Sequence, residues 1–126
     1  MHDRTVLVVE DDPAISELVT ELLDDAGYTV LQANLGRRGL RLAQEHTPSV
    51  MLVNNRLPDM SGLDLLERLR CQDATRRIPV VLVSGRTPQL TNDESVADRV
   101  LPMPFDIDVL LTHVEQLALA GSASAA

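Results

Sequence analysis

Residues 5–13 read Thr-Val-Leu-Val-Val-Glu-Asp-Asp-Pro, and this stretch decides the fold. An unbroken run of β-branched residues and leucine, followed by acids, predicts a strand that is buried on both of its faces. Asp12 can cap the free N–H groups of a following helix, and Pro13 suits the first helical turn. A buried strand that leads directly into a helix indicates an α/β unit.

Strand and helix patterns alternate from this unit onward. Further strands are predicted at Tyr28–Ala33, Val50–Asn54, Pro79–Ser84 and, more weakly, Val100–Leu101. The first helix ends at Gly27, a second runs from about Gly36 to His46, a third follows Gly62, and a fourth is capped at Asp106. Apolar residues at helical spacing are expected to face inward: Ile15, Leu18, Val19, Leu22, Leu23 and Ala26 in the first helix, Leu40 and Ala43 in the second, Leu63, Leu66 and Leu69 in the third, and Ile107, Leu110, Leu111, Val114 and Leu117 in the fourth.

Continuous apolar strands that alternate with helices imply a parallel sheet covered by helices on both faces. Right-handed crossovers then give a doubly wound, five-stranded α/β sheet, for which we predict the flavodoxin-like strand order 2-1-3-4-5. Ligands of such sheets bind beyond the C-terminal ends of the strands, at the switch point between strands one and three. Glu10, Asp11 and Asn54 are predicted to lie at that point.

The composition limits the class of protein. With 126 residues, 44% of them hydrophobic, the chain is expected to form one domain over residues 4–119, followed by a flexible tail at 120–126. There is no apolar run of membrane-spanning length and no signal-peptide profile at the start, so we expect a cytoplasmic protein. Cys71 is the only cysteine, which excludes an intramolecular disulfide and a thiolate metal site.

The charged residues argue against one kind of partner and rule out several kinds of site. The formal net charge of −8 argues against nucleic acid as a direct partner, because phosphates are neutralised by cations. All 11 basic residues are arginines. The absence of lysine rules out a Walker-type phosphate lysine, a Schiff base and a lysine general base.

Two stretches together resemble a known family. Residues 8–13, Val-Val-Glu-Asp-Asp-Pro, and residues 52–58, Leu-Val-Asn-Asn-Arg-Leu-Pro, followed by Gly62, are similar to the two halves of the receiver domain of bacterial two-component response regulators. The resemblance extends from about Arg4 to Leu119. It implies a module for phosphorelay signal transduction that contacts a histidine kinase or an output protein, rather than an enzyme.

Several family positions are matched. The resemblance places Glu10 and Asp11 at the acids that hold Mg²⁺, with Asp11 the more direct ligand, the backbone carbonyl of Arg56 at a further metal ligand, and Ser84 at the hydroxyl that contacts the phosphoryl group. A hard cation of this kind binds oxygen ligands, normally carboxylates and water. The alternative for Asp11 and Asp12 is that they only cap a helix.

Other family positions are altered. The phosphoacceptor aspartate is replaced by Asn54, whose neutral, delocalised amide oxygen is not a usable nucleophile. The lysine that precedes the proline after strand five is replaced by Met103, and the aromatic switch residue by Val100. Losing one carboxylate should also make Mg²⁺ binding weak or absent. The resemblance further implies a cis peptide bond between Met103 and Pro104.

Arg56 leaves two alternatives open. Its side chain could fold over the pocket and pair with Glu10 or Asp11 in place of the metal, or it could be a solvated loop residue of little energetic consequence.

The leading hypothesis is an atypical receiver domain, or pseudo-receiver, that acts by protein–protein contact without phosphorylation at Asn54. One alternative is a receiver that uses another acceptor or carries an Asp-to-Asn substitution. A second alternative is a small-molecule sensor with an apolar pocket near Met103.

Overall fold

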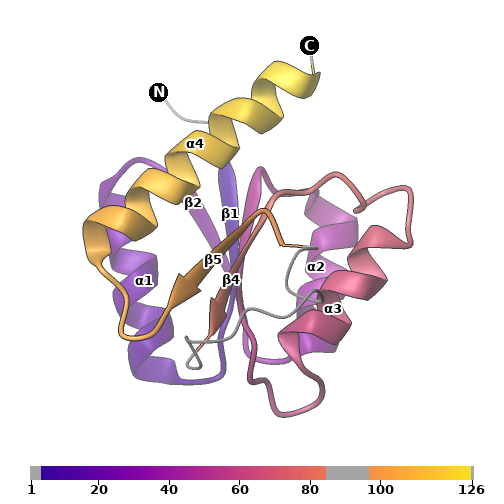
Figure 1. Cartoon of the computed structure of the whole chain (residues 1–126), viewed down its shortest axis with the longest axis horizontal. Coiled ribbons are helices and arrows are strands. Elements are labelled where there is room, and N and C mark those ends of the chain that lie inside the picture. The colour runs from indigo at the N-terminus through magenta and orange to yellow at the C-terminus, as the bar shows by residue number, and fades with distance from the viewer. Residues whose placement is uncertain (1–3, 85–96, 126) are drawn as a thin grey trace.

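The structure, a computed structural model, describes residues 4–84 and 97–125 of the chain. Strands and helices alternate through most of it (Figure 1), in the order β1 (Thr5–Val9), α1 (Pro13–Asp25), β2 (Thr29–Ala33), α2 (Gly36–His46), β3 (Val50–Asn54), α3 (Gly62–Arg70), β4 (Val80–Ser84), β5 (Arg99–Pro102) and α4 (Ile107–Ala125). The strands pair in parallel into one sheet with the order β2-β1-β3-β4-β5. The predicted doubly wound, flavodoxin-like sheet is confirmed.

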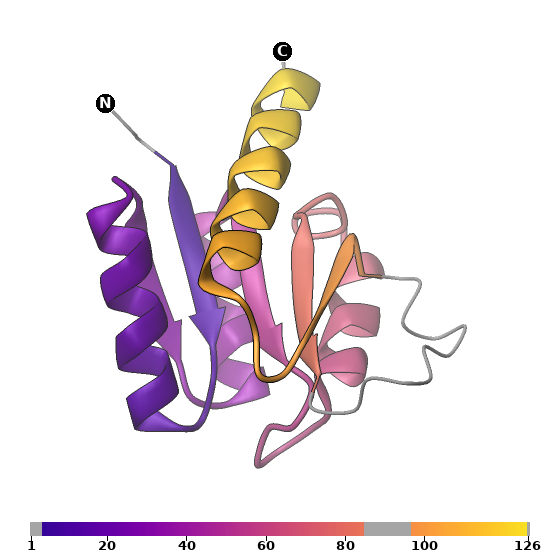
Figure 2. The ribbon, with the colours of Figure 1, turned by 60° about the vertical axis from the view of Figure 1, so that its left-hand side comes forward.

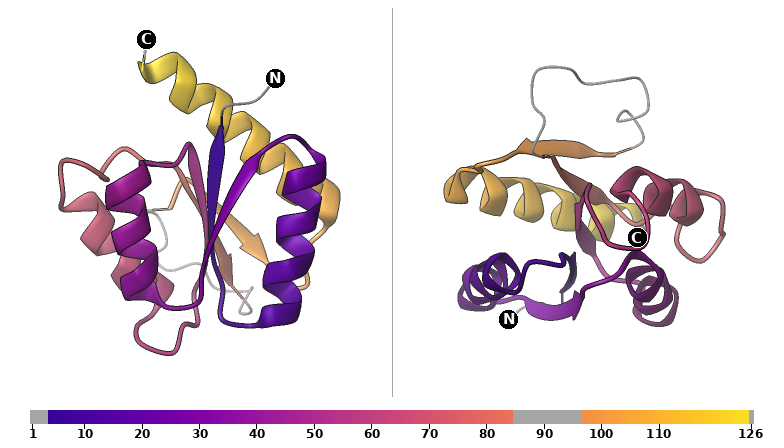
Figure 3. Two further views of the ribbon diagram at one scale, coloured as in Figure 1. Left: turned by 180° about the vertical axis from the view of Figure 1, so that it is seen from behind. Right: turned by 90° about the horizontal axis from the view of Figure 1, so that it is seen from below.

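Helices cover both faces of the sheet. Figures 2 and 3 show α1 and α4 on one face and α2 and α3 on the other. In β1, Val6 and Val8 pack into the apolar layer beneath α1 and α4, whereas Leu7 and Val9 pack into the layer beneath α2 and α3. Because successive side chains of a strand point to opposite faces, an uninterrupted apolar strand is stable only between two helical layers.

The predicted ends of the first helix are confirmed. The Asp12 carboxylate accepts hydrogen bonds from the backbone N–H groups of Ala14, at 2.9 Å, and Ile15, at 3.4 Å. Pro13 occupies the first turn. Gly27 follows the helix with a φ of 100°, a left-handed conformation that costs glycine little.

Three inward positions are wrong. Leu18 in α1 and Ile107 in α4 are 45% and 42% exposed, and Ala26 at the end of α1 is exposed as well. In α3, Leu63 is half-buried against the core as predicted, and Leu65 joins Leu66 and Leu69 in it. The strip of a helix that touches a sheet is narrower than the apolar stripe that helical spacing defines. Residues at the edge of the stripe are therefore left partly in water.

The C-terminal part of the chain differs from expectation in one respect. Helix α4 continues to Ala125, so residues 120–125, predicted as a flexible tail, extend the last helix. Alanine has the highest helix propensity, and no proline interrupts the segment. The Met103–Pro104 bond is cis, as predicted. Within the described residues, none of the helices combines the length and the hydropathy needed to cross a bilayer.

Candidate functional site

The predicted switch-point residues come together at the carboxyl ends of neighbouring strands. Glu10 directly follows β1, Asn54 ends β3 and Ser84 ends β4. The register of the sheet places these residues at similar heights along their strands, because Val9 pairs with Val53 and Asn54 pairs with Val83. Glu10 and Asn54 are therefore neighbours at one edge of the sheet, although 44 positions separate them in the sequence.

The Asn54 amide is bonded at both of its ends. Its Nδ2 donates to Glu10 Oε1 at 3.0 Å and to Glu10 Oε2 at 2.9 Å. Its Oδ1 accepts the backbone N–H of Arg56 at 3.0 Å. Because a backbone N–H can only donate, it requires the amide oxygen on its side and so directs the NH₂ group toward Glu10. Asn54 thus occupies the space beside the Glu10 carboxylate as a hydrogen-bond donor.

The Glu10 carboxylate is buried, with 6% of the residue exposed. Burial raises its pKa above the usual value, and the neighbouring Asp11 raises it further. Hydrogen bonds act in the opposite direction, from the Asp12 backbone N–H at 3.0 Å and from the Asn54 amide. Donors that satisfy a buried carboxylate offset much of the cost of removing it from water.

Asp11 and Arg56 are both exposed. The ion pairs among the described residues do not include one between Arg56 and either acid, so the solvated-loop alternative describes its side chain. The Asn54 amide, rather than the Arg56 guanidinium, pairs with the Glu10 carboxylate. The Arg56 backbone also forms an isolated bridge with Ser61 across the loop.

The residues at this point do not fit a magnesium ion as they are arranged. Both oxygens of Glu10 face an NH₂ group, and the Asn54 oxygen is turned toward a backbone N–H. Mg²⁺ requires oxygen ligands in near-octahedral geometry, and a donor hydrogen repels it. Asp11 and Asp12 are both exposed at this edge, and Asp12 is engaged in capping α1. In the part of the chain that the structure describes, no cluster of three or more His, Cys, Asp or Glu side chains could hold a metal.

The remaining family positions lie nearby, in an apolar setting. Ser84 is buried with 3% exposed, and its carbonyl accepts the backbone N–H of Met103 at 2.9 Å. Met103 and Phe105 pack on the apolar layer beneath α1 and α4. Val100 pairs with Leu82 in the sheet and is half-buried. Methionine here extends the apolar layer, where the family's lysine would bring a positive charge.

The loop after Asn54 contains a structural contact that sequence reasoning missed. The Asp59 carboxylate accepts the backbone N–H groups of Gly36, at 2.7 Å, and Arg37, at 3.0 Å, and so caps α2 from a distant loop. Leu35, the residue before α2, has no side chain that could cap it. A leucine at the N-cap position, where Ser, Thr, Asp or Asn is favoured, is the signal that another residue supplies the cap.

The cavity beside this site is small. The described residues around Glu10, Asn54 and Phe105 enclose about 10 Å³. Such a space holds at most about one water molecule. This space is therefore too small for a metabolite.

Comparison with known proteins identifies the family to which this fold and these motifs belong. Residues 6–115 match the family model of the response regulator receiver domain. The chain belongs to the response regulator receiver domain family. Among curated relatives, the DNA-binding dual master transcriptional regulator RpaA of Synechocystis is 36% identical over 115 residues, which cover 89% of this chain and 48% of that protein. The receiver chain thus spans about half the length of the curated relatives it matches.

Solved structures show the same fold. The Francisella response regulator 1452 receiver domain superposes with a TM-score of 0.87 at 27% identity, covering 94% of this chain and 98% of that one. The receiver domain of a sensor histidine kinase from Pseudomonas aeruginosa has a TM-score of 0.82 at 23% identity, covering 93% and 98%. That protein has a magnesium ion coordinated in its active site cleft.

Proposed function

We propose that this receiver domain passes on its signal by contact with a partner protein, without a phosphoryl group on Asn54. The proposal rests on the hydrogen bonds of the Asn54 amide, which donates to the Glu10 carboxylate and accepts the backbone N–H of Arg56. An amide in this position cannot act as the nucleophile, and it also supplies the donor that the buried Glu10 needs. The site is thereby held in one arrangement without metal or phosphate.

Two further positions support the proposal. A phosphoryl group carries close to two negative charges at neutral pH and needs a cation beside it. Met103 provides none, and Val100 lacks the aromatic ring of the family's switch. Three family positions have changed together: Asn54, Met103 and Val100. We therefore infer that the domain has lost several of the residues used for phosphorylation, rather than only the acceptor.

The partner we propose is a protein of two-component signalling, either a histidine kinase or an output protein, in the cytoplasm. The relatives include DNA-binding regulators, of which this chain matches about half. Its own net charge of −8 disfavours direct binding to nucleic acid.

Acetyl phosphate with Mg²⁺, followed by intact-mass spectrometry, tests the proposal. We expect no phosphate adduct on the parent protein. The double variant Asn54→Asp, Met103→Lys serves as the matched control, because it restores the carboxylate nucleophile and the cation together. A stable adduct mapped to Asn54 would refute the proposal. An adduct mapped to another residue would favour the alternative of a second acceptor.

A further inference from the structure

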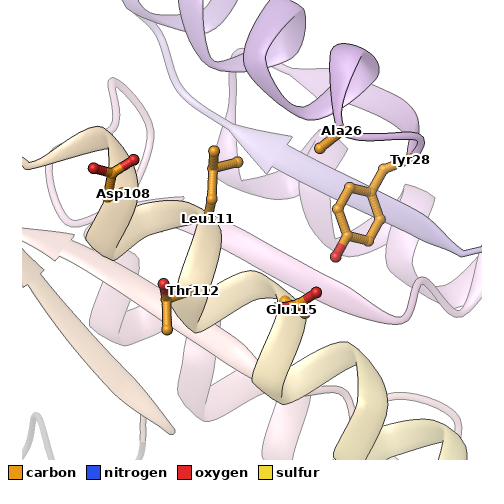
Figure 4. Close-up of a pocket in the computed structure, with 6 residues that line it drawn as sticks. All are labelled: Ala26, Tyr28, Asp108, Leu111, Thr112 and Glu115. Carbon is orange, nitrogen blue, oxygen red and sulfur yellow. The ribbon is translucent and has the colours of Figure 1, made fainter.

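A cavity of about 350 Å³ lies apart from the Asn54 site, between the C-terminal end of α1 and one side of α4 (Figure 4). Its volume falls within the range of small-molecule pockets. Six residues line it: Ala26, Tyr28, Asp108, Leu111, Thr112 and Glu115. We call it the Tyr28 cavity.

The charge on the lining is entirely negative. Asp108 and Glu115 contribute carboxylates, and they lie toward opposite ends of the cavity (Figure 4). The C-terminus of α1 adds a partial negative charge, since its last turn holds no basic residue to offset the helix dipole. The N-terminus of α4 brings a partial positive charge only beside Asp108, so Glu115 is the carboxylate that no helix N-terminus offsets. Helices α1 and α4 contain no arginine.

Acidic and basic residues are distributed unevenly over the whole chain. The eight arginines between residues 34 and 79 outnumber the five acids there, so the segment that includes α2 and α3 is positive overall. The acids of α1 and α4 lie on the other face of the sheet. The residues outside this segment therefore carry the excess of acids, and two of those acids, Asp108 and Glu115, line the Tyr28 cavity.

Tyr28 gives the cavity an aromatic wall. The residue is 7% exposed, and Figure 4 shows its hydroxyl directed toward α4 on the side of Glu115. Burial raises the pKa of Tyr28, the negative charge of Glu115 raises it further, and the charge of Arg4 opposes both. An aromatic face in a negative, partly dry environment attracts cations.

We propose that the Tyr28 cavity binds an organic cation, an ammonium or guanidinium group carried on an aliphatic stem. The cationic group pairs with Glu115 beside the Tyr28 ring, and the stem lies along Leu111 and Ala26. Asp108 and Glu115 are seven residues apart on α4, which corresponds to about 10 Å along the helix. A molecule with two cationic groups at about that spacing engages both carboxylates.

Two sources can supply this chemistry: a free di- or polyamine, and the arginine or lysine side chains of a partner protein. The proposal does not depend on the state of Asn54, so its outcome is separate from that of the phosphorylation test.

Tyr28 itself provides the assay, because it is the only tyrosine and the chain has no tryptophan. Its fluorescence is followed while the full chain is titrated with 1,7-diaminoheptane at physiological salt. The uncharged 1,7-heptanediol is the matched neutral probe, and the shorter 1,4-diaminobutane tests the spacing. A hexa-arginine peptide represents the side chains of a partner.

Two variants localise the effect. Glu115→Gln removes one charge inside the cavity, and Glu17→Gln removes one charge from an exposed position on α1 outside it. Thermal melts of both variants check that they fold.

We expect a saturable change with 1,7-diaminoheptane that is about tenfold weaker in Glu115→Gln, as for loss of one charge-assisted hydrogen bond, and unchanged in Glu17→Gln. A saturable, Glu115-dependent change with the peptide alone assigns the site to a partner's side chains. Binding of 1,4-diaminobutane should be weaker, because it cannot span both carboxylates. The proposal is overturned if neither 1,7-diaminoheptane nor the hexa-arginine peptide gives a saturable change, if the diol acts equally, or if both variants weaken binding alike.

Discussion

Asn54→Asp places two carboxylates where the protein now has an amide facing a carboxylate. The oxygens of the new side chain would stand about 3 Å from those of Glu10, judging by the present contacts of 3.0 and 2.9 Å. At an effective dielectric constant of about 20, two unit charges at that distance repel by about 5 kcal/mol. Loss of the hydrogen bonds to a charged group adds about 2 kcal/mol.

Proton uptake limits this cost. A carboxyl group with an ordinary pKa of about 4 can be protonated at pH 7 for about 4 kcal/mol, after which the two groups share the proton. Rotation of the new side chain relieves the repulsion further. We therefore expect Asn54→Asp to be destabilised by about 2–4 kcal/mol at pH 7 in the absence of divalent cations, which corresponds to a fall in Tm of about 10 °C for a domain of this size.

The interaction between the Glu10 carboxyl and the new carboxyl also determines how the stability of Asn54→Asp changes with pH. Repulsion raises the pKa of the paired carboxyls in the folded variant above their unfolded values, so the folded state binds more protons. The destabilisation is then fully present above the raised pKa and shrinks as the pH falls toward about 4. Mg²⁺ should restore part of the lost stability, because a cation between two carboxylates replaces the proton.

Circular dichroism melts in EDTA, with and without added Mg²⁺, measure the effect, and two variants control it. Asn55→Asp adds the same charge one residue away, and its oxygen can still accept the N–H of Leu63, so its Tm should change little. The double variant Glu10→Gln, Asn54→Asp exchanges the two groups and should regain most of the stability. Parent-like melting of Asn54→Asp without divalent cations, or an equal loss in Asn55→Asp, would show that the contact with Glu10 does not stabilise the site.

Two further predictions concern the loop after Asn54. Asp59→Ala should lose about 1 kcal/mol in a urea titration, because α2 loses the acceptor for its first N–H groups, whereas Asp73→Ala, on the exposed surface, should lose less. Burial tends to raise the pKa of Asp59, yet the N–H groups of Arg37 and Gly36 hold it below its usual value, so the Asp59 contribution should be complete above about pH 4 and disappear as the pH falls further. Gly62→Ala should cost about 1–3 kcal/mol, since a Cβ would lie 2.7 Å from the carbonyl oxygen of Asn54 and 2.8 Å from the Cα of Asn55; an unchanged melting temperature would mean that the loop can move aside.

Local sequence signals predicted the elements of this protein well. The run from Thr5 to Val9 specified a strand buried on both faces, Asp12 specified the start of a helix, and Gly27 its end. Such signals depend on residues a few positions apart, whose geometry is set by the backbone periodicity itself. The strand order and the place of the site followed from the general rules for doubly wound parallel sheets, and the resemblance to the receiver family added the expected roles of the residues there.

Side-chain partners were less predictable. Whether Leu63 or Leu65 is the more deeply buried, and how far Leu18, Ala26 and Ile107 are exposed, depends on the angle at which each helix lies on the sheet. Apolar residues at helical spacing show which side of a helix faces the core, whereas the residues that are buried on that side depend on how neighbouring elements pack against it.

The sequence by itself determined that position 54 carries an amide rather than a carboxylate and that the chain has no lysine, because both follow from residue identity alone. Only the tertiary structure decided what Asn54 does instead. The parallel register of β1 and β3 brings its amide against Glu10, and the loop between β3 and α3 returns Asp59 to the start of α2. These contacts join residues 44 and 23 positions apart, and at such separations the packed sheet, rather than local backbone preference, decides which groups meet.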